Sequence, residues 1–288
     1  MPYRLMIGNL FSASDCGVYI VTGATGGIGR AIVDGLAERG VKNIVLGVRN
    51  LNAGEKIARM YGGTVAVELL DLASFTSVCS FASRILASEI PVRALINNAG
   101  VLASRKDITV DGYETTMQVN WLSPVLLSYL LMPRIEKGGS ILFTTSFMRR
   151  VCRVTSHWHK LSTGKFNRFK VYAWSKLMLA QTARYMSAEL RRNGIYINCT
   201  DPGIVDTEIL RLGYRVVDGL ADCILRPVIS TPRQGAECTF RALEASDSGC
   251  VFTRRGCRPI AMRDSRHVSF SAVKSVINKA KILLNNEL

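Results

Sequence analysis

Thr22-Gly23-Ala24-Thr25-Gly26-Gly27-Ile28-Gly29 is the stretch that decides the fold of this chain. The residues before it, Gly17 to Val21, form an apolar, β-branched run typical of a buried parallel strand. After it, apolar residues recur at helical spacing from Ala31 to Ala37, and Gly40 ends the helix. Strand, glycine turn and helix predict the first unit of a dinucleotide-binding fold, in which a pyrophosphate sits on the helix N-terminus. The flanking strand and helix disfavour the alternative of a glycine-rich turn without a ligand.

The rest of the chain continues the same pattern. Strand-like runs alternate with helical runs along the 288 residues, without an internal repeat or a linker. This predicts an α/β fold with a single Rossmann-type, doubly wound parallel sheet, helices on both faces and one domain over residues 1–288. No apolar run reaches membrane-spanning length and the N-terminus lacks a signal-peptide pattern, so we expect a cytoplasmic protein.

Tyr172 and Lys176 form the most informative pair of polar side chains. Apolar residues from Val171 to Ala180 recur at helical spacing, so these positions, four apart, lie on one face. An isolated tyrosine has a pKa near ~10, whereas a cation roughly 6 Å away favours the phenolate by about 3 kcal/mol at an effective dielectric of about 20. The spacing therefore predicts a tyrosine with a lowered pKa, although Tyr-x-x-x-Lys also occurs by chance on surface helices.

The glycine spacing followed by Tyr-x-x-x-Lys resembles the short-chain dehydrogenase/reductase family. Further motifs of that family follow in the family's order after the expected strands and on the long helix. They are Asn97-Asn98-Ala99-Gly100, Val119-Asn120, Ser146 and Asp201-Pro202-Gly203. Several motifs in order are more specific than any one of them, and the resemblance covers roughly residues 17–255.

The resemblance implies four catalytic residues. Tyr172 would be the general acid in reduction and the general base in oxidation, and Ser146 would polarise a carbonyl group. Lys176 would hold the nicotinamide ribose, and Asn120 would hold a water that links Lys176 to solvent. The alternatives are that Asn120 bonds to backbone inside its helix and that Ser146 caps a strand. The joint occurrence of these residues with the cofactor motifs disfavours both.

The cofactor is expected to be NADP(H). Arg49-Asn50 follows the second expected strand, where NAD-preferring enzymes of this fold place an acid, and an arginine attracts a 2′-phosphate. The retinol-dehydrogenase-like subgroup of the family also has Arg-Asn there and uses NADP(H); the alternative is that Arg49 is merely solvated. The expected cofactor-binding residues are Gly23, Thr25, Gly26, Gly27, Ile28, Gly29, Arg49, Asn50, Asp71, Leu72, Asn98, Ala99, Gly100, Tyr172, Lys176, Pro202, Gly203, Val205 and Thr207.

Two departures from the ordinary family pattern resemble the same subgroup. One is the long insertion from Phe147 to Val171, and the other is the stretch from Thr231 to Ala236, where Arg233 replaces the usual acid. The insertion contains basic residues and no acid: Arg149, Arg150, Arg153, Lys160, Lys165, Arg168 and Lys170. It either selects an acidic, phosphate-bearing or carrier-bound substrate near the substrate mouth, or is a solvated loop of a basic protein.

Residues 204–230 correspond to the segment that closes over substrate in this family. Their apolar content suits a hydrophobic substrate such as a retinoid, steroid, quinone or acyl chain, although any mobile lid looks similar.

Residues 268–284 form a basic amphipathic stretch that either packs on the domain or a partner subunit, or lies on a membrane surface. A homodimer and a peripheral membrane contact therefore both stay open.

The formal net charge of +15 makes attraction to polyanions physically plausible. The basic residues are spread along the chain without an aromatic-interleaved stripe, so no nucleic-acid partner is expected.

The eight cysteines show no Cys-x-x-Cys spacing, which indicates free thiols in a reducing compartment. His157 and His159 lack a nearby third ligand, and no metal site is expected.

Two functions from different classes follow. The first is an NADP(H)-dependent oxidoreductase that transfers hydride between nicotinamide and a carbonyl or alcohol, and the intact Asn120, Ser146, Tyr172 and Lys176 favour it. The second is a catalytically weak NADPH-binding protein that senses redox state or regulates a partner. Reduction of a carbon–carbon double bond is a third option that the same Tyr–Lys pair would allow.

Overall fold

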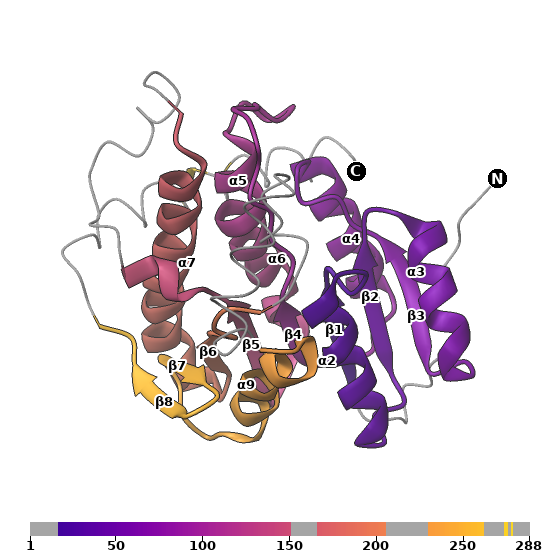
Figure 1. The fold of residues 1–288 in the computed structure, drawn as a ribbon. Helices are drawn as coiled ribbons and strands as arrows, with labels where there is room; N and C mark the ends of the chain where they lie inside the picture. The colour runs from indigo at the N-terminus through magenta and orange to yellow at the C-terminus, as the bar shows by residue number, and fades with distance from the viewer. Residues whose placement is uncertain (1–16, 151–165, 206–229, 262–273, 276–277, 279–288) are drawn as a thin grey trace.

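A computed structural model describes residues 17–150, 166–205 and 230–261, together with 274, 275 and 278 (Figure 1). Within these residues, eight strands form one sheet in the order β3-β2-β1-β4-β5-β6-β7-β8. The strands are β1 (Val18–Thr22), β2 (Ile44–Val48), β3 (Val65–Leu69), β4 (Val92–Asn97), β5 (Ile135–Thr144), β6 (Tyr196–Thr200), β7 (Cys250–Thr253) and β8 (Gly256–Pro259). All neighbours pair in parallel except β7 and β8, which form an antiparallel hairpin.

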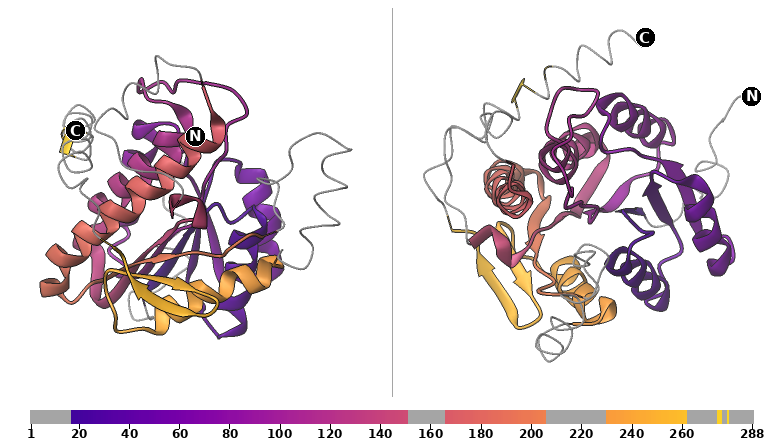
Figure 2. Two further views of the ribbon diagram at one scale, coloured as in Figure 1. Left: turned by 60° about the vertical axis from the view of Figure 1, so that its left-hand side comes forward. Right: turned by 45° about the horizontal axis from the view of Figure 1, so that its top comes forward.

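Helices connect the parallel strands. They are α2 (Gly27–Glu38), α3 (Leu51–Ala58), α4 (Phe75–Ala87), α5 (Thr115–Met117), α6 (Ser123–Leu131), α7 (Arg168–Leu190) and α9 (Pro232–Glu244). Short turns are η1 (Arg59–Tyr61), η2 (Gln118–Leu122), η3 (Met132–Arg134), η4 (Phe147–Arg150) and η6 (Arg191–Asn193). The predicted doubly wound α/β fold is confirmed, because helices alternate with parallel strands and cover both faces of the sheet (Figure 2).

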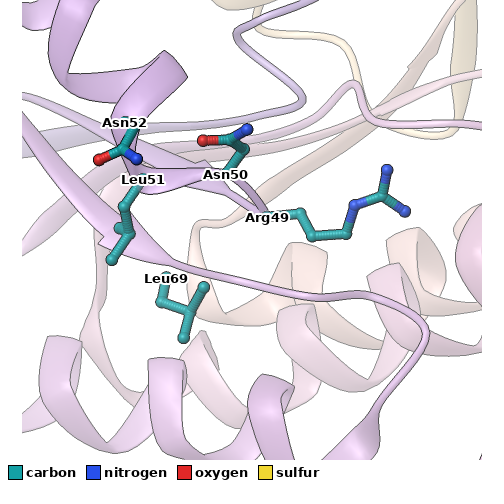
Figure 3. A pocket seen from close by; sticks show the side chains of 5 residues that line it. All are labelled: Arg49, Asn50, Leu51, Asn52 and Leu69. Atoms are coloured by element: carbon teal, nitrogen blue, oxygen red, sulfur yellow. The ribbon is translucent and has the colours of Figure 1, made fainter.

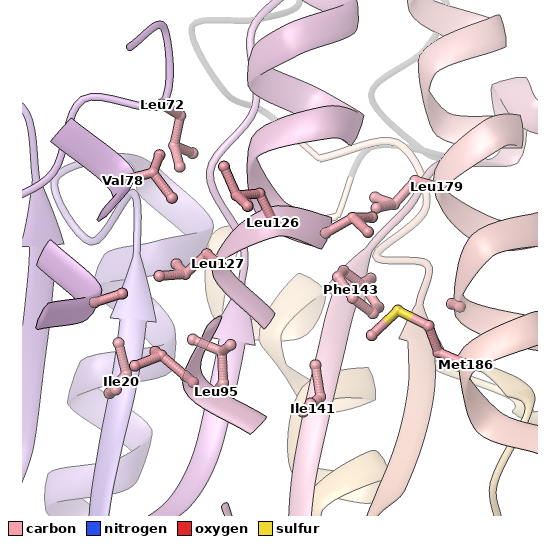
Figure 4. Close-up of a cluster of buried hydrophobic side chains, with 14 of the residues drawn as sticks. Ile20, Leu72, Val78, Leu95, Leu126, Leu127, Ile141, Phe143, Leu179 and Met186 are labelled. Carbon is pink, nitrogen blue, oxygen red and sulfur yellow. The ribbon is translucent and has the colours of Figure 1, made fainter. Parts of the chain in front are cut away.

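Each face of the sheet has its own hydrophobic core. On the face covered by α4, α6 and α7, Leu126, Leu127 and Leu179 belong to one cluster with Ile141 and Phe143 (Figures 2 and 4). On the opposite face, α2 and α9 contribute a second cluster. Strands buried on both faces need apolar residues at successive positions, which is why β1 and β2 read as almost continuous apolar runs.

The strand order places a candidate ligand site. The chain runs from β1 outward to β2 and β3, then returns to β4 on the other side of β1. This reversal creates a crevice at the carboxyl ends of β1 and β4, where ligands of open parallel sheets bind. The glycine turn after β1 and Asn98-Ala99-Gly100 after β4 lie at that edge.

Several sequence predictions concern residues outside the described ranges. They are most of the lid at 204–230, most of the C-terminal helix at 268–284, Thr207, and the basic residues Arg153, Lys160 and Lys165. Of the C-terminal segment, Lys274, Ser275 and Asn278 are described, and they are helical and exposed. Among the helices of the described ranges, none combines the length and the apolar character needed to cross a bilayer.

Candidate active site

Two positions of the glycine turn after β1 have room or backbone geometry for glycine alone. Gly23 has φ of +67°, and a Cβ there would lie 2.7 Å from the Cα of Ala99. A Cβ on Gly29 would lie 2.2 Å from the carbonyl oxygen of Gly23. The turn therefore folds tightly against the start of α2 and against the residues that follow β4.

Thr22 and Asn98 tie the two sides of the crevice together. The hydroxyl Oγ1 of Thr22 accepts hydrogen bonds from the backbone N–H groups of Asn98 and Ala99, both at 3.1 Å. The Asn98 amide Nδ2 donates to the carbonyl oxygen of Thr22 at 3.1 Å. Thr22 is thus a structural residue of the site that its sequence position, directly before Gly23, could have indicated.

The N-terminus of α2 fits a phosphate group. Thr25, Gly26 and Gly27 are exposed, and the N-cap residue Gly26 makes no side-chain capping bond. No acidic residue stands in the first turn. The backbone N–H groups of that turn and the positive end of the helix dipole are therefore available to an anion.

Arg49 lies at the next turn along the same edge. It borders an open pocket together with Asn50, Leu51, Asn52 and Leu69, and its side chain extends away from those of Leu51 and Leu69 (Figure 3). The Arg49 side chain is exposed. Asn50 is already used locally, because its side chain caps α3 by accepting a hydrogen bond from Ala53 N at 3.1 Å.

Asp71 and Leu72 follow β3, where the resemblance places contacts to the adenine. The carboxylate of Asp71 accepts a hydrogen bond from Ala73 N at 2.9 Å, and Ser74 N donates to the Asp71 carbonyl oxygen. The carbonyl oxygen of Leu72 accepts a 2.6 Å bond from Ser123 Oγ. These bonds fix the turn, and an adenine contact there stays a prediction.

Ser146, Tyr172 and Lys176 meet at the carboxyl end of β5. The hydroxyl groups of Ser146 and Tyr172 are hydrogen-bonded. The Lys176 ammonium donates to the carbonyl oxygen of Thr144 at 2.8 Å and lies 5.8 Å from the centroid of the Tyr172 ring. The predicted helix is confirmed, since α7 carries both residues on one face, and Lys176 is buried.

The pKa of Tyr172 moves in the direction opposite to the one predicted. Burial raises the pKa of Tyr172 to about 12; the hydrogen bond with Ser146 lowers it, and the charge of Asp201 raises it further. Burial also lowers the pKa of Lys176 to about 8. The expectation of a lowered tyrosine pKa is wrong for this arrangement, because desolvation of the phenolate outweighs the attraction that the helical spacing suggested.

Asn120 lies in η2, a π-helical turn before α6. Its side chain accepts from Val101 N at 2.7 Å and donates to Val101 O at 2.9 Å and to Ser175 Oγ at 3.1 Å. The side chain thus fixes the segment that follows Gly100. A Cβ on Gly100 itself would lie 3.1 Å from Lys176 Nζ, so this turn lies close to the lysine. The backbone partner, Val101, lies outside the helix of Asn120, so the alternative of a bond inside that helix is not what the structure shows; the role of Asn120 in holding a water stays a prediction.

Arg149 differs from the other basic residues of the insertion. It is buried, and its guanidinium forms an ion pair with the buried carboxylate of Asp201. Arg149 is therefore not solvated, as the loop interpretation of the insertion would require, and its charge is paired with Asp201, which directly follows β6. Lys170 lies over the ring of Trp174, 5.1 Å from its centroid, and Arg168 donates to Leu102 O at 3.0 Å.

The remaining expected positions follow β6. The backbone N–H of Gly203 donates to Asp201 Oδ1 at 3.2 Å, and Val205 forms a parallel bridge with Ser230. Pro202 is buried and Gly203 is exposed.

Arg233, on α9, forms an exposed ion pair with Glu38 at 2.7 Å. In the described part of the chain, no cluster of three or more His, Cys, Asp or Glu residues could hold a metal ion.

The fold and the glycine turn define a Rossmann-type dinucleotide-binding protein. The family described as short chain dehydrogenase matches residues 17–213. The chain belongs to the short-chain dehydrogenase/reductase family, and as a member it is an oxidoreductase that transfers hydride with a nicotinamide cofactor, NAD or NADP.

Curated relatives narrow the position within the family. Human retinol dehydrogenase 11 is 32% identical over 228 residues, which cover 76% of this chain and 70% of the relative. Polyprenol dehydrogenase of Mus musculus is 34% identical over 235 residues, covering 76% and 69%. The predicted resemblance to the retinol-dehydrogenase-like subgroup is thereby confirmed.

A solved structure supports the fold. The crystal structure of an uncharacterised protein from Mycobacterium Paratuberculosis superposes with a TM-score of 0.73 at 23% sequence identity. The match covers 94% of this chain and 97% of the other.

Proposed function

We propose that this protein is an NADP(H)-dependent oxidoreductase that interconverts a carbonyl and an alcohol on a hydrophobic substrate, with Tyr172 as the proton-transfer group. One observation carries the proposal: Ser146, Tyr172 and Lys176 converge beside Gly100, at the edge where the glycine turn opens. When bound, the nicotinamide supplies or accepts the hydride. The side chains of the protein handle the oxygen and its proton.

In reduction, negative charge develops on the carbonyl oxygen. The Ser146 hydroxyl donates a hydrogen bond to that oxygen, and the Tyr172 hydroxyl transfers a proton to it. Because burial raises the pKa of Tyr172 to about 12, the phenol is protonated at neutral pH, which suits the donor role. In oxidation the same phenol must first lose its proton, so the alcohol-oxidising rate rises with pH more steeply than the carbonyl-reducing rate.

Arg49 supports NADP(H) over NAD(H). Its exposed guanidinium stands after β2, at the turn where the ribose 2′ position lies in this fold. A guanidinium forms charge-assisted, bidentate hydrogen bonds with a phosphate. The described residues of that turn, from Arg49 to Asn52, include no acid that would repel one.

A hydrophobic substrate is supported by the relatives and by the surface around Tyr172. Two relatives are named for retinol and polyprenol, which are long apolar alcohols. Phe147, next to Ser146, and Phe169, three residues before Tyr172 on α7, are exposed at 40% and 44%. Exposed aromatic rings that are neighbours of Ser146 and Tyr172 in the sequence support an apolar chain leading to the reacting group.

The test is oxidation of NADPH, and separately of NADH, by the purified chain with a panel of apolar aldehydes, ketones and quinones. We expect turnover with long-chain or cyclic apolar carbonyls and a preference for NADPH. Binding of NADPH without turnover of any carbonyl would overturn the oxidoreductase proposal and favour the redox-sensing alternative. Equal use of NADH would overturn the cofactor assignment alone.

A further inference from the structure

Arg149 connects two turns of the active site through a buried ion pair. Its Nη1 donates to the backbone carbonyl oxygen of Ser146 at 2.8 Å and also to the Asp201 carboxylate. The side chains of Arg149 and Asp201 are 9% and 5% exposed. The arginine is thus anchored on the very residue whose hydroxyl is hydrogen-bonded to Tyr172.

Asp201 continues the connection to the next turn. Its second carboxylate oxygen, Oδ1, accepts a hydrogen bond from the backbone N–H of Gly203 at 3.2 Å. The backbone N–H of Asp201 donates to Phe252 O at 2.8 Å, which fixes the residue against β7. A continuous chain of polar contacts therefore runs from Ser146 through Arg149 and Asp201 to Gly203.

The sheet does not need this connection. Beyond the last strand residues, Thr145 already ties the two strand ends together, because its N–H and its hydroxyl both donate to Thr200 O, at 2.7 and 2.9 Å. A buried ion pair also carries a desolvation cost, and an apolar pair of similar volume is often equally or more stable. What the pair adds is the placement of the two turns that extend past the strands.

We propose that Arg149 and Asp201 are a positioning pair for hydride transfer, which holds the Ser146 turn and the Pro202-Gly203 turn at a fixed separation. The inference rests on the proposed function, in which Ser146 contacts the substrate carbonyl, and on the expectation that Pro202 and Gly203 bind the cofactor. Neither side chain touches a reacting atom. Misplacement by about 1 Å far from the chemistry costs on the order of 100-fold in rate, so such a pair has a measurable effect.

The pair also contributes charge near the phenol. The Lys176 ammonium on the same helix and the Asp201 carboxylate after β6 lie near Tyr172, and Asp201 is paired with Arg149 of η4. Asp201 raises the pKa of Tyr172. Replacing both charges with neutral groups of similar shape therefore shifts the alkaline limb of the pH–rate profile for alcohol oxidation to lower pH.

The experiment compares two double variants. Arg149→Met with Asp201→Asn removes both charges and keeps the approximate shapes, so that no buried charge is left unpaired. Arg233→Met with Glu38→Gln is the matched control, because it removes an ion pair that is exposed instead of buried. For each variant we would measure kcat and KM with NADPH and an apolar aldehyde, the pH–rate profile, and backbone hydrogen exchange in residues 144–150 and 201–205.

The expected result separates positioning from structural support. The Arg149→Met/Asp201→Asn variant remains folded, kcat falls roughly 10- to 100-fold with a smaller change in KM, and exchange accelerates in both segments but not in β1 or β2. The control matches the wild type in every measurement. Arg149→Lys, which keeps the charge, gives an intermediate kcat and serves as the informative variant if the double variant does not fold.

Two outcomes would overturn the inference. One is a kcat, pH profile and exchange pattern indistinguishable from the wild type. The other is a loss of stability in the double variant, or in Arg149→Lys, with kcat unchanged, which is the mark of a purely structural pair. Absence of turnover in the wild type would instead count against the proposed function, and exchange in the two segments would still decide whether the pair holds the turns.

Discussion

The two sides of the carboxyl edge of the sheet are built differently. Around β1 and β2, the expected cofactor side consists of backbone N–H groups, glycines and exposed side chains, including Gly26 and Arg49. Around β5 and β6, the expected reaction side consists of buried and paired polar side chains, including Lys176, Arg149 and Asp201. The first side leaves its charges and donors unpaired toward solvent, whereas the second pairs them within the protein.

The difference follows from what each side would meet. A dinucleotide phosphate brings its own charge, so exposed N–H groups and one arginine suffice to attract it. A carbonyl group brings no charge, so the protein must supply fixed donors whose orientation does not depend on the ligand. Changes on the cofactor side should therefore alter affinity, while changes on the reaction side should alter turnover and stability.

The largest expected effect is on the reaction side. Tyr172→Phe removes the only proton that the phenol can transfer, and we expect turnover to fall ~10²–10⁴-fold, the usual contribution of general acid–base catalysis. NADPH binding, followed by fluorescence titration, should stay within the error of the wild type. Tyr185→Phe is the control, because Tyr185 lies on the same helix but is exposed. Substantial turnover in Tyr172→Phe would show that another group transfers the proton.

The next largest effect is on the free energy of unfolding, which we compare between a buried and an exposed ion pair. Arg149→Met leaves the buried carboxylate of Asp201 without its partner and should lower the free energy of unfolding by roughly 3–5 kcal/mol. Arg233→Met breaks an exposed pair with Glu38 and should cost about 1 kcal/mol or less. Urea denaturation of both variants measures the difference. Equal losses in the two variants would contradict the contrast between buried and exposed charge.

A smaller effect, on the affinity for NADPH, is expected from a change on the cofactor side. Arg49→Ala should weaken NADPH binding roughly 10- to 100-fold, because hydrogen bonds to charged groups contribute about 1.5–3 kcal/mol. NADH binding should change little, since NADH lacks the 2′-phosphate. Lys56→Ala, at the exposed end of α3, is the control for a general loss of positive charge. A parallel loss of NADPH and NADH affinity would argue that Arg49 only supports the fold of its turn.

The fold was predictable because its signals are local. The glycine turn, the apolar run of β1 and the helical spacing around Tyr172 each lie within a few residues of one another. The close approach of Ala99 to Gly23 explains why glycine stands at that position, and the sequence already indicated it as a cofactor turn. Local pattern and tertiary structure agree on this side of the molecule.

The reaction side was less predictable, because its energetics depend on partners distant in the chain. Asp201 is 52 residues away from Arg149, and nothing near Arg149 in the sequence distinguishes it from the basic residues around it. The pKa of Tyr172 was predicted in the wrong direction for a related reason. Helical spacing reveals that Lys176 is close, but only the packed structure reveals that burial of the Tyr172 side chain outweighs this attraction.

The smallest expected effect concerns the buried ammonium and its dependence on pH. Burial lowers the pKa of Lys176 to about 8 from an ordinary value of 10.5, so the unfolded chain binds more protons than the folded one between these values. Stability from this group therefore rises with pH through that window. Below pH 8 the folded state bears the full cost of a charged, buried lysine.

Lys176→Met removes this cost at every pH, and it also removes the bond to Thr144 O. The difference in unfolding free energy between Lys176→Met and the wild type should therefore shift by about 1 kcal/mol in favour of the wild type between pH 7 and pH 9. Comparing the two proteins by urea denaturation cancels the titration of Cys238, which both proteins share. Cys199 interacts with the Lys176 charge, but burial raises its pKa to about 12, so it stays protonated in the folded state between pH 7 and pH 9. A difference that does not change with pH would mean that Lys176 keeps its charge throughout, held by partners strong enough to offset its burial. The reaction side would then resemble the cofactor side in having its cation available to a ligand at all pH values.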